Sequence, residues 1–164
     1  LEVDPHSQEV LMTRATLVST LARVFCGAVF LIHGTPKIFN LEGTAMFFAD
    51  NFGVPGWLSV PVAVLEFFGG ILLIAGFLTR ILAGLFMVEM AGAAFVNRAH
   101  GWDFMQGGYE YNIALILLLL GVLLIGPGPF SVDGALGWGR ARAGREAEPL
   151  EPESDLELRG SEQK

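Results

Sequence analysis

The stretch VAVLEFFGGILLIAGF, residues 62–77, has the composition of a membrane-spanning helix that is interrupted by a single acid, Glu66. A carboxylate at the depth of the hydrocarbon core is costly unless it is protonated, paired with a cation or open to a wet cavity. Glu66 therefore marks this span as a candidate functional position, and another part of the chain has to supply its partner.

Composition extends this interpretation to the whole chain of 164 residues, which is 52% apolar and only 16% charged. That leaves too little polar surface for a soluble globular domain, and the apolar residues are gathered into blocks that approach the roughly 20 residues a helix needs to cross a bilayer core. We predict an all-α protein, a transmembrane four-helix bundle. Its spans are expected at about 15–34, 57–77, 80–97 and 111–126.

The segments outside the spans have their own patterns. Between Asn40 and Trp57, three phenylalanines fall on one helical face and polar residues on the other, which predicts a short amphipathic helix along the outer interface. Gly53 and Pro55 are expected to end it. Pro36 predicts a kink or an end near the close of the first span. We divide the chain into a polar segment 1–13, a transmembrane domain 14–139, and a tail 140–164 whose mixed charge predicts disorder.

Basic residues set the predicted orientation. Four spans put both termini on one side of the membrane, together with Arg14, Arg80 and the arginines of the tail, whereas the other side holds only Lys37 and Arg98. The positive-inside rule then places both termini in the cytoplasm, which suits a multi-pass protein of a bacterial or archaeal cytoplasmic (inner) membrane. With a net charge of −7, the chain has no basic surface of the kind that binds nucleic acid. The expected partners are the lipid bilayer and other membrane or membrane-associated subunits.

Three ionisable residues are expected near the same depth on three different helices: Arg23, Glu66 and Glu89. Because an unpaired charge in lipid is costly, we predict that Arg23 pairs with Glu66 and that Glu89 is a surplus acid that would hold a proton. Two interpretations stay open. The pair fixes helix register in the bundle, or the cluster transfers protons to a quinone or hydrogen-bonds its oxygen.

A second candidate cluster lies toward the outer face. His33 and Lys37 are four residues apart on one helical face, and Glu110 and Tyr109 begin the last span, so an ion pair between Lys37 and Glu110 is expected. Tyr109 fits either an interfacial aromatic belt or stacking on a quinone ring. The single cysteine, Cys26, excludes a CxxC pair and is expected to be a packing residue, and no spacing of ligands predicts a metal site or an intrinsic cofactor.

Several segments together resemble the DoxX family. They are LARVFCGAVFLIHGTPKIFN (21–40), FFADNFGVPGW (47–57), LEFFGGILLIAGFLTR (65–80) and GWDFMQGGYEYNIALILLLLGVLLIGPGPFSVDGAL (101–136). The resemblance covers about residues 20–137. The positions that match the family pattern are Arg23, Gly34, Lys37, Glu66, Gly70, Glu110, Gly126 and Asp133, whereas Glu89 departs from it.

The resemblance implies a role at a membrane rather than a defined reaction. Some relatives are similar to a subunit of archaeal thiosulfate:quinone oxidoreductase, and others act as membrane partners of soluble redox enzymes, so fold alone does not assign function. We predict an accessory or scaffold subunit of a membrane redox complex. The alternative is a quinone-interacting oxidoreductase subunit that uses Arg23 and Glu66, with a bound quinone and with electrons from a partner, since the chain has no evident redox centre of its own.

Overall fold

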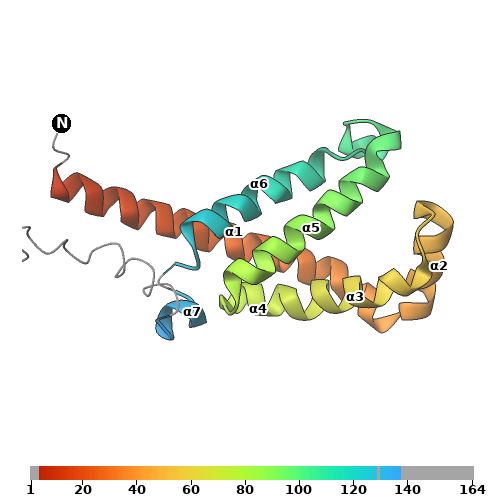
Figure 1. Ribbon diagram of the computed structural model, residues 1–164, viewed down its shortest axis with the longest axis horizontal. Coiled ribbons are helices and arrows are strands. Elements are labelled where there is room, and N and C mark those ends of the chain that lie inside the picture. The colour runs from red at the N-terminus through yellow and green to blue at the C-terminus, as the bar shows by residue number, and fades with distance from the viewer. Residues whose placement is uncertain (1–3, 129, 138–164) are drawn as a thin grey trace, which may run out of the picture.

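The computed structural model describes residues 4–128 and 130–137, and within these ranges it is helical and contains no strand (Figure 1). This confirms the all-α prediction. Three helical segments are long and apolar enough to cross a membrane: Glu9–Phe39, Gly56–Ala75 and Thr79–His100. The fourth predicted span corresponds to Glu110–Ile125, which is shorter, so a count of four transmembrane helices stays a prediction. The predicted tail 140–164 lies outside the described residues.

Helix α1, Pro5–Phe39, is the longest element. At its start, the Asp4 side chain accepts a hydrogen bond from the His6 N–H. Pro5 follows Asp4 in the first turn, where a backbone N–H would have no partner within the helix, so the N–H that proline lacks is not missed. Its 35 residues correspond to about 52 Å, and its N-terminal turns extend beyond the other helices in Figure 1. The predicted polar segment 1–13 is thus helical from Pro5 onward, and the helix continues for three residues past Pro36.

Helix α2, Leu41–Phe52, is the short helix predicted in the first outer loop. The Asn40 side chain accepts a hydrogen bond from the Gly43 N–H at its start, and Gly53 adopts the left-handed conformation, with a φ of 62°, at its end. In Figure 1 it stands at one end of the molecule, beside the end of α1 and the beginning of α3.

The second span is a single helical segment built from four pieces. A 3₁₀ turn, η1 (Gly56–Leu58), leads into α3 (Ser59–Val64), a π-helical turn η2 (Leu65–Gly69) and α4 (Gly70–Ala75). A π turn accommodates one residue more than an α turn, which rotates the side chains on either side of it relative to one another, and such turns are frequent at functional sites. The turn here contains Glu66.

Glycines bring this span into close contact with α1. A Cβ on Gly34 would lie 2.5 Å from the Phe67 nitrogen, and a Cβ on Gly70 would lie 2.9 Å from the Gly27 carbonyl oxygen. Small residues at such positions allow two membrane helices to approach backbone to backbone. The two helices run antiparallel, because Gly27 faces Gly70 whereas Gly34 faces the π turn.

Helices α5 (Thr79–Asn97) and α6 (Glu110–Ile125) form a hairpin, joined through the 3₁₀ turns η3 (Arg98–His100) and η4 (Phe104–Gln106). Phe30 of α1 and Phe86 of α5 stack with ring centroids 3.7 Å apart inside the core, and Cys26 is fully buried beside them, as expected of a packing residue. The tip of the hairpin diverges from α2 in Figure 1. The short helix α7 (Val132–Ala135) closes the described chain.

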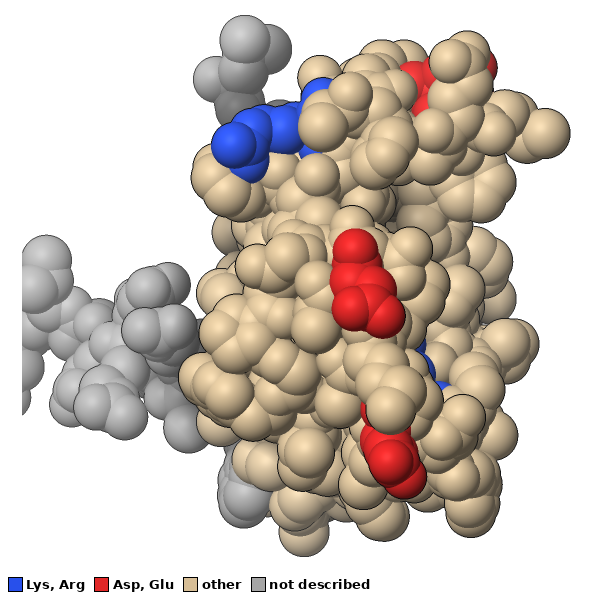
Figure 2. Space-filling model, turned by 90° about the vertical axis from the view of Figure 1, so that its right-hand side faces the viewer, with Lys and Arg blue, Asp and Glu red and all other residues tan. Residues whose placement is uncertain are grey.

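The surface of the molecule is predominantly apolar. Figure 2 shows the end that carries α2 and the hairpin tip, where lysine, arginine, aspartate and glutamate are few and most atoms belong to uncharged residues. Many large apolar side chains are exposed along the helices, including Leu21, Ile32, Val88 and Leu124. An environment of lipid accounts for such a surface.

Candidate functional site

A cavity of about 570 Å³ lies between the α5–α6 hairpin on one side and α1, α2 and α3 on the other. This volume is in the range of small-molecule binding sites. Its walls are largely apolar and aromatic, and they include Phe30, Phe47, Phe48, Phe52, Val62 and Leu115. The charged side chains that line it come from three directions, with Lys37 on α1, Glu66 on the π turn and Glu89 on α5, and His33 lies beside Lys37 on α1.

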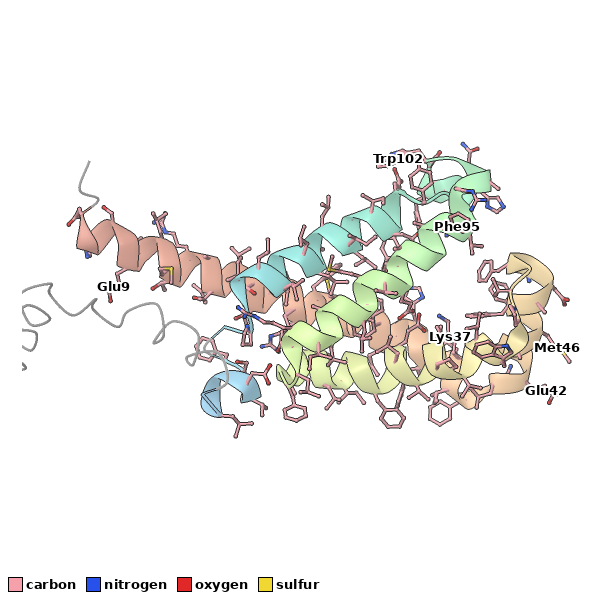
Figure 3. All side chains as sticks on the ribbon, in the orientation of Figure 1. Glu9, Lys37, Glu42, Met46, Phe95 and Trp102 are labelled. Carbon is pink, nitrogen blue, oxygen red and sulfur yellow. The ribbon has the colours of Figure 1, made fainter. Side chains whose placement is uncertain are left out.

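Glu66 forms an ion pair with Lys37 at the cavity wall. The Lys37 ammonium donates to both carboxylate oxygens of Glu66, with Nζ 2.6 Å from Oε1 and 2.5 Å from Oε2. Glu66 is only 3% exposed, whereas the Lys37 side chain is 26% exposed. Gly34, one turn before Lys37, packs on the backbone of Glu66 and so sets this pairing. Figure 3 shows Lys37 directed from the end of α1 toward the space between α5 and the second span.

The predicted pair between Arg23 and Glu66 is therefore wrong. The prediction placed Arg23 at the middle of a span of about 20 residues, whereas α1 has 35 residues and extends beyond that span at both ends. Antiparallel packing brings the π turn opposite Gly34 and Lys37, and Arg23 lies 14 residues earlier, about 21 Å along the helix axis. Glu66 and Glu89 do come together as predicted.

Arg23 instead satisfies backbone carbonyls at the other end of the second span. Its guanidinium donates to the carbonyl oxygens of Leu73, Ile74 and Phe130, at 2.7, 2.5 and 2.7 Å. Leu73 and Ile74 belong to the last turn of α4, where carbonyls lack the donors of a following helical turn, although the Leu73 carbonyl also accepts the N–H of the cap residue Gly76. Arg23 is 1% exposed, so it acts as a buried cap of this helix end.

Asp133 completes this end by capping the next helix. Its two carboxylate oxygens accept hydrogen bonds from the backbone N–H groups of Leu78 and Thr79, at the start of α5, and its own N–H donates to the Gly76 carbonyl. Arg23 and Asp133 attract each other electrostatically. Together they hold the tight turn between α4 and α5, where Gly76 and Leu78 both have positive φ values.

Glu89 lies against the Lys37–Glu66 pair from the opposite wall. Its carboxyl group interacts electrostatically with that of Glu66 and with the charge of Lys37. Its Oε2 atom is buried and has no hydrogen-bond partner among the described residues. The cluster on the cavity wall thus contains one cation and two acids.

The remaining outer-face candidates are divided between the cavity and the hairpin tip. His33 is exposed and lines the cavity with Lys37. Glu110 instead accepts a hydrogen bond from the Phe104 N–H, so the predicted Lys37–Glu110 pair is wrong. Tyr109 packs edge-on against Trp102, which is labelled at the hairpin tip in Figure 3. The hairpin tip is held by its own backbone contacts and diverges from the end of α1, which keeps Glu110 away from Lys37.

Two cavity residues on α6, Tyr111 and Asn112, were not predicted as site residues from the sequence. Asn112 is buried, accepts a hydrogen bond from Asn97 and donates to the sulfur of Met90. An amide at the start of an otherwise apolar run was a signal that could have identified it.

This arrangement suits the head group of an amphiphilic molecule. The aromatic and aliphatic walls accommodate a ring and an apolar tail, while the charged cluster offers polar atoms at one place on the wall. A quinone-type head group fits these residues. Within the described residues, no group of three or more His, Cys, Asp or Glu side chains is placed to hold a metal ion.

Fold and site together define a small helical membrane protein with an amphiphilic cavity. The family model described as DoxX matches residues 18–99. "Putative oxidoreductase CatD" of Bacillus subtilis is 33% identical over 113 residues, covering 69% of this chain and 82% of the relative. The chain therefore belongs to the DoxX family.

Two further relatives come from Escherichia coli. "Inner membrane protein YphA" is 30% identical over 122 residues, covering 69% of this chain and 86% of the relative. "Inner membrane protein YqjF" is 33% identical over 119 residues, covering 71% and 89%. No solved structure matches the chain.

Proposed function

We propose that this protein is an accessory subunit of a membrane redox complex and that its cavity binds a quinone-type molecule. The observation that carries the proposal is the buried Lys37–Glu66–Glu89 cluster on the wall of an otherwise apolar cavity. A charged cluster at membrane depth is costly to maintain, and such clusters mark ligand or proton pathways more often than they serve packing. The name of the Bacillus relative, "Putative oxidoreductase CatD", supports the redox assignment.

The chain's own residues would bind and orient the ligand. The phenylalanines of α2 and the aliphatic residues of α5 and α6 exclude water from the ring, and the pairing with Glu66 keeps the Lys37 ammonium at one place on the wall. A bound quinone supplies the chemistry, because it can accept two electrons and two protons. The electrons would come from a partner protein. The predicted orientation puts the cavity toward the outer side of the membrane, at the end of α1 opposite its N-terminus.

Two glycines of α5 provide a matched test of the binding site. Gly92 lines the cavity, Gly84 does not, and a Cβ added at either would meet no atom within 4 Å. Gly92→Leu should therefore fill part of the cavity without disturbing the helices, and Gly84→Leu should leave the cavity unchanged. We would titrate decylubiquinone into each variant in lipid nanodiscs and measure the dissociation constant.

We expect Gly92→Leu to weaken decylubiquinone binding at least about ten-fold, which corresponds to a loss of about 1.4 kcal/mol in binding free energy. Gly84→Leu should bind decylubiquinone as the unaltered protein does. Equal binding by all three proteins would show that the quinone does not occupy the cavity. Absence of binding to the unaltered protein would contradict the proposal directly.

A second candidate function, a scaffold without a ligand, is favoured by the N-terminal part of α1. This part extends beyond the other helices and exposes large apolar side chains, including Leu11, Met12 and Val18. A partner helix packed there would bury them. Native mass spectrometry of the protein from its own membranes would test this: a stoichiometric partner that is lost on Leu11→Ser and Val18→Ser, without a bound quinone, would favour the scaffold role.

A further inference from the structure

The cavity lies between two helical segments, the second span and α5, that pack closely near the turn that joins them. Close to that turn, a Cβ added to Gly69 would lie 3.1 Å from the Phe86 Cζ atom, so the segments are in contact there. Farther along α5, Gly92 lines the cavity, and an added Cβ would meet no atom of the described chain within 4 Å. Figure 1 shows the two segments diverging from the turn toward the end that carries α2. They therefore leave a gap at the level of the cavity.

Val88 indicates that this gap faces the lipid. Its side chain lines the cavity and is nevertheless 72% exposed. Val88 lies near the middle of α5, on the same exposed side of the helix as Ile81, Leu85 and Phe95. Such an apolar stripe is the surface that acyl chains cover in a membrane. The rim of the cavity and the lipid-facing side of α5 thus share a residue.

The opposite side of the cavity is closed by α1, because this helix contacts both flanking segments. Phe30 of α1 stacks on Phe86 of α5, and Gly34 of α1 packs on the backbone of Glu66 in the second span. His33 of α1 lines the cavity and is exposed, so this back wall is accessible from the cavity. The gap between α5 and the second span is the side of the cavity that α1 leaves uncovered.

We propose that this gap is a lateral entrance, through which the head group of a quinone-type molecule enters the cavity while its apolar tail stays in the bilayer. A cavity of about 570 Å³ encloses a molecule the size of a head group, and a long tail in addition needs an exit that keeps it out of water. This inference rests on the proposed function. It adds the class of ligand, a lipid-dissolved molecule with a long tail, and the route by which it binds.

Two tryptophan substitutions on α5 provide a matched test of the entrance. Val88→Trp places a bulky side chain at the rim, and Leu85→Trp places the same side chain about one turn earlier, at an exposed residue that does not line the cavity. Because both positions are exposed, neither substitution should disturb the core. We would measure binding in lipid nanodiscs of decylubiquinone and of the same dimethoxy-methyl-benzoquinone head group without the tail. Ligand concentrations would be expressed per volume of membrane, so that partition of the tail into lipid does not count as binding.

The unaltered protein should bind the two molecules with dissociation constants within about three-fold of each other, because the tail is surrounded by lipid both before and after binding. Val88→Trp should weaken decylubiquinone binding at least about ten-fold and binding of the tail-less head group by less than about three-fold, since only the tail has to occupy the gap. Leu85→Trp should bind both molecules as the unaltered protein does.

A spin label on the back wall tests the opening without any quinone. The label would be attached to His33→Cys in a Cys26→Ala background, with a label at Met105→Cys, on the exposed hairpin tip, as the aqueous reference. Collisions with molecular oxygen, which concentrates in lipid, would be compared with collisions with a water-soluble nickel chelate. At residue 33 we expect oxygen collisions to dominate, to become less frequent in Val88→Trp and to stay unchanged in Leu85→Trp.

Three results would overturn the inference and leave the proposed function intact. The first is decylubiquinone binding by the unaltered protein that is at least about ten-fold weaker than binding of the tail-less head group. The second is an equal effect of Val88→Trp on both molecules, and the third is a predominance of nickel collisions at residue 33, which would show that the cavity opens to water. If neither molecule binds to the unaltered protein, the proposed function fails instead, and the spin label still decides whether the cavity opens to lipid.

Discussion

Arg23 and Lys37 are two cations on the same helix, α1, and they differ in what they contact. Arg23 donates to the backbone carbonyls of α4 and of Phe130, so its hydrogen bonds are made to groups that cannot move without unfolding the turn. Lys37 contacts a side chain, Glu66, at the wall of a cavity. We refer to these two regions as the cap end and the cavity end of the bundle.

The difference separates two uses of buried charge in a membrane protein. At the cap end, Arg23 and Asp133 hydrogen-bond backbone groups at helix termini, and neither residue lines the cavity. At the cavity end, one cation faces two acids, and a Glu89 oxygen remains without a partner. Each end holds a buried acid, Asp133 or Glu66, that interacts with a cation. The partner of each charge, rather than its burial, therefore distinguishes a structural group from a candidate binding group.

The largest effect is expected from Arg23→Ala at the cap end. Removal of the guanidinium would take a donor from the carbonyls of Leu73, Ile74 and Phe130, of which Leu73 keeps the Gly76 N–H, and would leave Asp133 without its cation. This should lower the free energy of unfolding by about 3–5 kcal/mol. Thermal unfolding in detergent would measure this, with Arg23→Lys as an intermediate case because an ammonium lacks the planar fork. An unchanged melting temperature in Arg23→Ala would show that the cap end does not stabilise the bundle.

Gly34→Ala tests how the cavity end is positioned. The added Cβ would lie 2.5 Å from the Phe67 nitrogen, so α1 and the π turn must separate. We expect a loss of about 1–3 kcal/mol in the free energy of unfolding and weaker decylubiquinone binding, since Glu66 moves away from Lys37. Gly84→Ala, which meets no atom, should not destabilise the protein. Full retention of stability and binding in Gly34→Ala would show that this contact does not position Glu66.

Asp133→Asn should have a smaller effect, about 1–2 kcal/mol on the free energy of unfolding. An amide has one acceptor oxygen, so only one of the Leu78 and Thr79 N–H groups would keep its partner. Quinone binding should be unchanged, because the cap end is remote from the cavity. Asp103→Asn, at an exposed cap of η4, is the matched control and should cost less. A change in quinone binding in Asp133→Asn would show that the two ends are coupled.

The smallest effect on stability is expected from the double variant Lys37→Met with Glu66→Gln. Replacing both members of the pair removes one positive and one negative charge together and leaves the net charge of the cluster unchanged, so the free energy of unfolding should stay within about 1 kcal/mol of that of the unaltered protein. Lys37→Met alone should be less stable than the double variant. We expect decylubiquinone binding to fall about ten-fold in the double variant. Unaltered binding would limit the role of this pair to holding the helices together.

The sequence predicted a large part of the fold because hydropathy and capping are local properties. The long apolar runs predicted the helices at 57–77 and 80–97, and the structure has them at Gly56–Ala75 and Thr79–Asn97. The phenylalanine pattern and Gly53 predicted α2 and its end. The intramembrane acids Glu66 and Glu89 were also evident, because any carboxyl group in an apolar run is conspicuous.

The partners of those acids could be decided only by the tertiary structure. Estimates of depth put Arg23 opposite Glu66, but the register between α1 and the second span is set by the contacts of Gly27 and Gly34, and the π turn changes the direction in which Glu66 points. A register shift or an extra residue in one turn leaves hydropathy unchanged. The sequence by itself therefore determined that this is a helical membrane protein with charges inside, whereas the packing of its helices decided that Lys37 meets Glu66 at a cavity and that Arg23 caps a helix.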